Sequence, residues 1–183
     1  MQPGQCQLFC LQPIAVGAAA GPRLPVGRRL KISVRRHMTP DTERAIKKRT
    51  NQLMVRITGR TGRSPATATP ITTPEAGGLT AGDAVRVRTQ DEIQATLNHW
   101  RQLKGCTFMA EMAPYCGTTQ RVLKPVRRFV DERDLRAKKA KGIVLLEGVM
   151  CQGTADFGPC DRSCHFFWRE EWLEKIPIGA TAP

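Results

Sequence analysis

Cysteine is concentrated in one short stretch near the end of the sequence. Three of the seven cysteines, Cys151, Cys160 and Cys164, fall within 14 residues, and His165 directly follows the last of them. Two glycines and a proline lie between the first two cysteines, and such residues let a backbone turn tightly around a small centre. A fourth cysteine, Cys116, completes the spacing C-x34-C-x8-C-x3-C if the fold brings it close to the others.

These four cysteines predict a metal site. Thiolate is a preferred ligand of zinc and of iron–sulfur clusters, and four thiolates close a tetrahedral structural site. Zinc is the first expectation and an iron–sulfur cluster is the alternative, with His165 as a possible substitute for one cysteine ligand. Because the spacing is not a double C-x-x-C, reduced buried thiols and a disulfide pair stay open as other interpretations.

The distribution of charge divides the chain into two parts. Residues 1–80 carry 13 Lys/Arg against 3 Asp/Glu, whereas residues 81–183 carry 16 against 13, so most of the net charge of +13 belongs to the first part. A basic segment attached to a nearly neutral domain indicates a polyanionic partner, most often the phosphates of RNA or DNA. A solvated basic tail is the alternative interpretation.

Residues 1–38 are expected to form an extended basic arm. Proline and glycine recur in it, and no acidic residue precedes Asp41. An acid-free, arginine-bearing start is typical of a mitochondrial transit segment, with a plastid one as the alternative. Leu30, Ile32 and Val34 alternate with basic or small residues, which predicts a short strand added to a partner's sheet. No apolar run approaches the roughly 18–20 residues of a membrane span, so none is expected.

Residues 39–58 are expected to form a basic amphipathic helix. Thr39 suits the N-cap, Pro40 suits the first helical position, and Gly59 marks the end. Two interpretations are open: the helix lies along RNA, or it docks on its own domain through an apolar face. That face consists of Ile46, Leu53, Met54 and Ile57. The side chains expected to contact phosphate are Arg28, Arg29, Lys31, Arg35, Arg36, Arg44, Lys47, Lys48, Arg49, Arg56, Arg60 and Arg63.

The rest of the chain divides into a linker, one domain and a tail. Residues 59–81 are rich in proline, threonine and glycine and predict an extended linker. Residues 82–176 form the expected domain, and residues 177–183 form the tail. The domain opens on Val85 and Val87, whose alternation with arginine predicts a strand.

A helix capped by Asp91 or Thr89 is expected next, ending before Gly105, because Ile93, Leu97, Trp100 and Leu103 are spaced as a core stripe. Further strands are expected over residues 119–130, broken at Pro125, and over residues 143–150. The charged residues 131–141 between them predict a hairpin tip or a short helix.

The aromatic residues 165–173 fit a helix or a strand. These elements predict an α+β domain: a small, SH3-like, partly open β-barrel with one helix and a cysteine-rich metal centre. About 100 residues form only a small core, so a metal would add to the stability of such a domain.

Residues 82–175 resemble a family of small, functionally uncharacterised proteins found mainly in bacteria. The resemblance rests on five motifs, G-D-x-V-R-V, E-I-x-x-T-L, F-M-x-E-M-x-x-Y-C-G, L-E-G-V-x-C-x-G and C-x-x-x-C-x-x-F-W-x-E-x-W-L, which begin here at Gly82, Glu92, Phe108, Leu146 and Cys160. It implies no catalytic activity. It implies that the four cysteines named above belong to the common pattern and that Cys6, Cys10 and Cys106 do not. The first motif is also similar to the opening strand of SH3-like ribosomal proteins.

A bacterial-type domain with a basic, transit-like extension is the build of many organelle-specific ribosomal subunits. We therefore expect a non-catalytic structural subunit of a mitochondrial ribosome, in the matrix, that binds rRNA and neighbouring ribosomal proteins and takes no small-molecule substrate. An accessory subunit of a respiratory-chain complex is the alternative. A metal-dependent or redox enzyme is a third interpretation, which is weakened because Cys164 and His165 are adjacent and would point to opposite faces of a strand.

Overall fold

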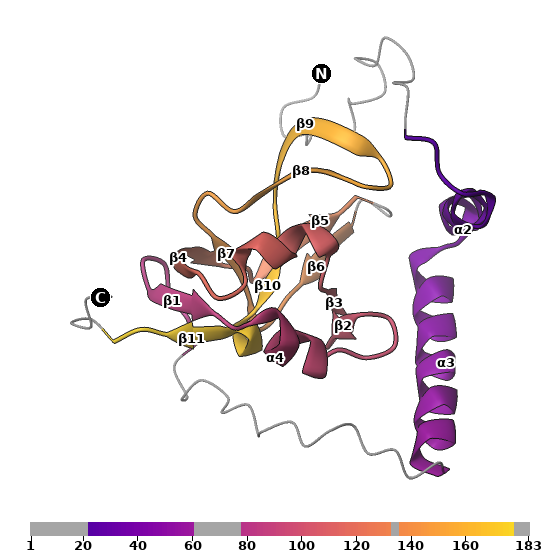
Figure 1. The fold of residues 1–183 in the computed structure, drawn as a ribbon, viewed down its shortest axis with the longest axis horizontal. Coiled ribbons are helices and arrows are strands. Elements are labelled where there is room, and N and C mark those ends of the chain that lie inside the picture. Colours follow the sequence, from indigo (N-terminus) through magenta and orange to yellow (C-terminus); the bar gives the residue numbers. More distant parts are fainter. Residues whose placement is uncertain (1–21, 61–77, 133–135, 178–183) are drawn as a thin grey trace.

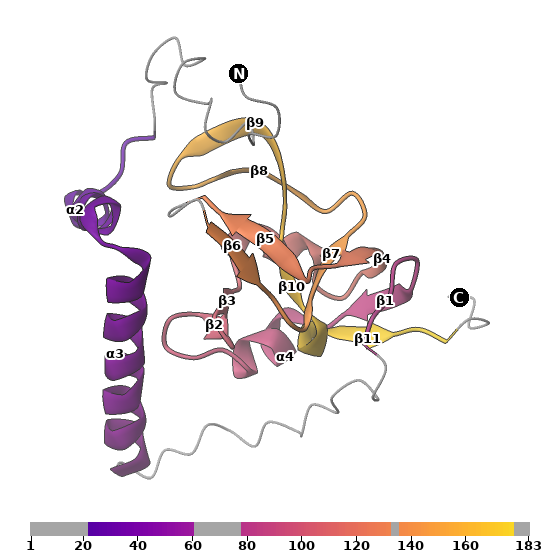
Figure 2. The same cartoon turned by 180° about the vertical axis from the view of Figure 1, so that it is seen from behind.

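The computed structural model describes residues 22–60, 78–132 and 136–177. Two helices, α2 (Val26–His37) and α3 (Pro40–Arg60), precede a domain built mainly of strands. Figures 1 and 2 show both helices to one side of that domain, with α2 turned sharply from α3. The α+β class predicted from the sequence is confirmed. The expectations for residues 1–21, for most of the linker and for most of the tail lie outside the described residues.

The domain contains eleven strands and three short helices within the described residues. In chain order the elements are β1 (Ala84–Val87), α4 (Gln90–Ala95), β2 (Gln102–Leu103), β3 (Cys106–Thr107), η2 (Ala110–Tyr115), β4 (Thr119–Pro125), β5 (Arg128–Asp131), β6 (Arg136–Lys139), β7 (Ile143–Leu146), β8 (Met150–Thr154), β9 (Gly158–His165), β10 (Trp168–Arg169), η3 (Glu170–Trp172) and β11 (Leu173–Lys175).

Five strands form one antiparallel sheet in the order β10-β7-β4-β1-β11. The pairs β2–β3, β5–β6 and β8–β9 form three separate two-stranded ribbons. The predicted break at Pro125 separates β4 from β5. Of the predicted hairpin tip or short helix at residues 131–141, Asp131 and Arg136–Lys139 lie in the antiparallel pair β5–β6, as the hairpin alternative had it, and residues 133–135 lie outside the described residues. The finer prediction of an SH3-like barrel stays a prediction.

The core lies against this sheet. Val85 and Val87 are fully buried, so the alternation that predicted the first strand is confirmed. Trp168 and Trp172 are also fully buried and meet edge to face, with ring centroids 6.5 Å apart. The segment between them is partly extended and partly a single helical turn, which explains why its periodicity fits neither a helix nor a strand alone.

The expectation of an extended arm is wrong for residues 26–37, which form the helix α2. Val26, Leu30 and Val34 are spaced by four residues, so they fall on one side of a helix. The strand prediction instead followed the alternation of Leu30, Ile32 and Val34. The helix begins after Pro25, whose carbonyl oxygen accepts hydrogen bonds from the backbone N–H groups of residues 28 and 29. No helix in the described part of the chain is apolar and long enough to cross a membrane.

The helix predicted up to Leu103 is half as long as expected, because α4 ends at Ala95. Of the two predicted caps, Asp91 and Thr89, the structure has Thr89, which forms a reciprocal capping box with Glu92. Beyond the helix, the Asn98 side-chain oxygen accepts hydrogen bonds from the backbone N–H groups of Trp100 and Gln102, at 2.9 and 3.0 Å. An asparagine that bonds to the backbone in this way favours a turn over a helix.

Candidate functional site

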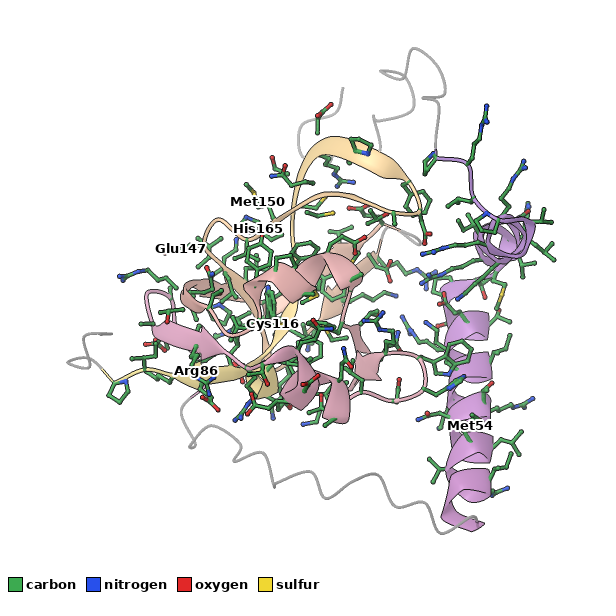
Figure 3. The ribbon with its side chains drawn as sticks, viewed as in Figure 1. Met54, Arg86, Cys116, Glu147, Met150 and His165 are labelled. Carbon is green, nitrogen blue, oxygen red and sulfur yellow. The ribbon has the colours of Figure 1, made fainter. Side chains whose placement is uncertain are left out.

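The cysteine-rich stretch forms the ribbon β8–β9. Cys151 lies directly opposite Cys164, and Met150 lies opposite His165. Side chains of directly opposite residues project from the same face of a ribbon, so the two sulfur atoms are neighbours. Figure 3 shows Met150 and His165 together near the base of the ribbon, whereas Cys116 lies nearer the middle of the domain.

A bulge at Gly153 shapes the ribbon beside Cys151. The pairing register shifts between these two residues, and Gly153 has a φ of 113°. A Cβ atom at this position would lie 2.2 Å from the carbonyl oxygen of Gly158, so only glycine fits. The Gly153 N–H donates a hydrogen bond to Cys151 Sγ at 3.4 Å. The Cys151 Sγ in turn lies 3.4 Å from the Gly153 carbonyl oxygen.

A pocket of about 370 Å³ lies beside these two cysteines. Cys106 and His165 also line it, and its remaining walls are mostly apolar. Cys106 Sγ lies 3.3 Å from the Phe167 carbonyl oxygen, and burial raises the pKa of this thiol to about 11. Cys106 is therefore a protonated thiol at neutral pH.

The structure brings together two of the four predicted metal ligands. Cys151 and Cys164 are neighbours, Cys160 is exposed further along β9, and Cys116 does not line the pocket. Burial raises the pKa of Cys116, which favours its thiol form. Among the described residues no three His, Cys, Asp or Glu side chains are grouped closely enough to hold a metal ion. The fit to a four-cysteine site is therefore partial, and the site stays a prediction.

Sequence reasoning did not include Cys106 in this cluster. The sequence signal that could have found it is the Lys104-Gly105 dipeptide, because glycine is typical of a two-residue hairpin turn. In the structure the two residues form such a turn between β2 and β3, and both have a positive φ, at 48° and 85°. That turn places Cys106 at the start of β3 and brings it to the pocket.

The basic helices form a second candidate site. Residues 26–60 carry eleven Lys/Arg and two Asp/Glu, a net charge of +9. Four of the side chains predicted to contact phosphate form ion pairs with carboxylates of this chain. Arg28 pairs with Asp156, Arg44 pairs with Asp41, and both Arg35 and Lys47 pair with Glu43. Within the described residues no carboxylate pairs with the exposed cations Arg29, Lys31, Lys48, Arg49 and Arg56. The side chains of Arg36 and Arg60, and the whole of Arg63, lie outside the described residues.

A polar face of α3 is turned inward. Glu43 is buried, and Lys47, which binds it at 2.7 Å, lies 6.0 Å from the centre of the Trp100 ring. Ile46 and Leu53, on the predicted apolar face, are 47% and 56% exposed. The interpretation in which α3 docks on its own domain through that apolar face is therefore wrong. The cation–π contact between Lys47 and Trp100 connects α3 to the domain instead.

Comparisons with protein-family models, with curated proteins and with solved structures found no match.

Proposed function

We propose that this chain is a non-catalytic structural subunit of a mitochondrial ribosome, in which α2 and α3 contact rRNA phosphates and the domain contacts neighbouring ribosomal proteins. The observation that carries the proposal is the excess of cations on α2 and α3. Because so few carboxylates lie near these helices, exposed cations such as Arg49 and Arg56 are available to an external anion.

Further support comes from how α2 and α3 are held. The extensive contacts of the fold lie within the β domain. Single polar contacts, such as the Arg28–Asp156 ion pair, connect the helices to that domain. Exposed ion pairs contribute about 1 kcal/mol or less, so a larger binding partner would hold the helices more firmly than the domain does. In the proposal, an SH3-like β domain forms the protein-binding part of the subunit.

The first test removes three exposed cations of α3. We expect the full chain to bind single-stranded RNA with an affinity that falls steeply between about 50 and 200 mM salt. Replacing Lys48, Arg49 and Arg56 by glutamine should lower the slope of log K against log salt by about 2, since each lost phosphate contact on a single strand removes about 0.7. Fluorescence anisotropy of a labelled RNA measures both quantities.

The matched control is a triple glutamine variant at Arg86, Lys104 and Lys175, which removes the same charge from ion-paired positions on the domain. It should keep the wild-type slope. Association with the ribosome is tested separately. The full chain should sediment with mitochondrial ribosomes, and ribonuclease should release it. Sedimentation that ribonuclease does not change would contradict the proposal and favour a protein complex such as a respiratory one.

The proposal includes a zinc ion held by Cys116, Cys151, Cys160 and Cys164, with an iron–sulfur cluster as the alternative. The support is the pairing of Cys151 with Cys164 across the β8–β9 ribbon. We expect one zinc per chain in protein purified without oxygen, and loss of the metal in Cys160→Ser. The matched control, Cys106→Ser, should keep it.

Elemental analysis measures the metal content of all three proteins, and visible absorbance reveals a cluster. A metal-free wild-type chain would contradict the metal site. Loss of the metal from Cys106→Ser but not from Cys160→Ser would contradict the predicted ligand set.

A further inference from the structure

The positive charge of the domain is concentrated in one segment. Residues 121–141 carry nine Lys/Arg and three Asp/Glu, a net charge of +6, whereas the rest of residues 81–183 has a net charge of −3. The low net charge of the whole domain therefore hides a strongly basic segment. This segment contains β4 from Arg121 onward and the ribbon β5–β6.

The two faces of the β5–β6 ribbon differ in exposure. On one face Arg128 lies opposite Lys139, and Val130 lies opposite Ala137, with all four side chains exposed. We call this set the outer face of the ribbon. Phe129 points the other way, and its ring packs against that of Phe167 with centroids 5.4 Å apart. Figure 2 shows the two strands side by side.

The outer face carries an unfavourable charge pair. Like charges directly opposite each other on a ribbon destabilise it, and Arg128 and Lys139 are such a pair. In the part of the chain that the structure describes, no carboxylate forms an ion pair with either side chain. A bound anion that contacts both cations would remove this repulsion.

The ribbon is anchored well enough to present these cations in a fixed place. Phe129 packs on a small core cluster with Val126, Ile143 and Leu145. At the distal end, Glu132 accepts two hydrogen bonds from the Arg162 guanidinium, at 2.7 and 3.0 Å, which ties β5 to β9. A bidentate pair of this kind fixes orientation as well as distance.

We propose that the outer face of the β5–β6 ribbon is a second RNA-binding surface, which contacts phosphate groups through Arg128 and Lys139. The proposal rests on the proposed function, because it adds a contact on the domain to those of α2 and α3. The outer face presents two cations and no ring or amide, so it suits phosphate contacts and not base edges. An acidic protein is disfavoured because protein interfaces use large apolar or aromatic anchors, and here Val130 and Ala137 are the only apolar residues.

The test uses the full chain and a double variant, Arg128→Gln with Lys139→Gln. With a single-stranded uridine homopolymer as the probe, we expect the salt slope to fall by about 1.4, which corresponds to two lost phosphate contacts. The melting temperature without RNA should equal or exceed that of the wild type, because the repulsive pair is gone. The matched control, Arg86→Gln with Lys175→Gln, removes two ion-paired cations and should keep the wild-type slope.

The outcomes separate the two proposals. A wild-type slope in the ribbon variant, together with a reduced slope in the α3 variant, would overturn the ribbon surface and leave the proposed function standing. A wild-type chain that does not bind RNA would overturn both. Competition by polyglutamate as strong as that by RNA would assign the ribbon to an acidic protein and overturn the RNA surface.

Discussion

Replacing Trp172 by alanine is expected to destabilise the domain by about 3–5 kcal/mol, the usual cost of removing a large aromatic side chain from a core. Trp172 is fully buried and packs edge to face against Phe108, with ring centroids 5.7 Å apart, as well as against Trp168. Its indole N–H also donates a hydrogen bond to Thr96 Oγ1 at 3.1 Å. The variant leaves a cavity in the middle of the core and removes the partner of that hydroxyl.

Urea unfolding followed by far-ultraviolet circular dichroism measures this loss. Phe157→Ala is the matched control, because Phe157 is 64% exposed, and its truncation should change the free energy of unfolding by less than about 0.5 kcal/mol. A Trp172→Ala variant as stable as this control would show that the core is not centred on the tryptophan pair.

Replacing Arg169 by methionine is expected to cost about 3–5 kcal/mol, because it removes one partner of a buried ion pair and leaves the other partner in place. Arg169 is only 7% exposed, and its guanidinium donates two hydrogen bonds to the Glu171 carboxylate, at 2.7 and 2.9 Å. A third hydrogen bond, at 3.0 Å, goes to the carbonyl oxygen of Lys141. The variant should keep the packing of the arginine stem but leave Glu171 with Lys104 as its cationic partner.

The chain offers a matched control for this prediction. Arg162 binds Glu132 with the same two-bond geometry, but both side chains of that pair are about half exposed. Arg162→Met should therefore change the free energy of unfolding by about 1 kcal/mol or less. Equal losses in the two variants would mean that burial does not decide the strength of the Arg169–Glu171 pair.

The same pair predicts how stability depends on pH. Burial alone would raise the pKa of Glu171, but hydrogen bonds from Arg169 and Lys104 outweigh it and lower the pKa from 4.5 to about 2. A carboxyl group with a lower pKa in the folded state contributes stability that is present above pH 4.5 and is lost as the pH falls toward 2. The difference in stability between wild type and Arg169→Met should therefore shrink as the pH falls from 7 to about 3.

Much of the fold follows from local sequence patterns. The alternation at Val85 and Val87 and the break at Pro125 each describe a property of a few neighbouring residues, and each appears in the structure where it was expected. The helix cap falls on Thr89, one of the two residues predicted for it. The helix α3 begins after Thr39 for the same reason, since Thr39 Oγ1 accepts a hydrogen bond from the Thr42 N–H at 3.3 Å. Elements whose causes are local can be predicted locally.

Two errors came from segments in which two periods compete. Residues 30–34 alternate as a strand would, but Val26 adds a spacing of four that belongs to a helix, and the helix is what forms. After Ala95 the apolar residues keep a helical spacing, but the Asn98 side chain bonds to the backbone and turns the chain away. In the first case the deciding residue is Val26, which lies outside the alternating stretch. In the second case it is Asn98, which lies within the stretch of helical spacing.

The candidate sites depended on the tertiary structure to different degrees. The cationic character of α2 and α3 was visible in the sequence, because charge is a property of composition. Spacing alone could not say which cysteines are neighbours. The register of β8 and β9 pairs Cys151 with Cys164, and a hairpin turn at Lys104 brings Cys106 to the same pocket.

By itself, the sequence determined the α+β class, the division into a basic N-terminal part and a β domain, and the start of a few elements such as α3, β1 and α4, because hydrophobic period, caps and charge are local properties. The tertiary structure alone decided which face of α3 is turned inward, which thiols lie together, and that Arg128 and Lys139 face each other on an exposed ribbon. These features depend on strand register and on contacts between residues far apart in the chain, and local patterns carry no information about either.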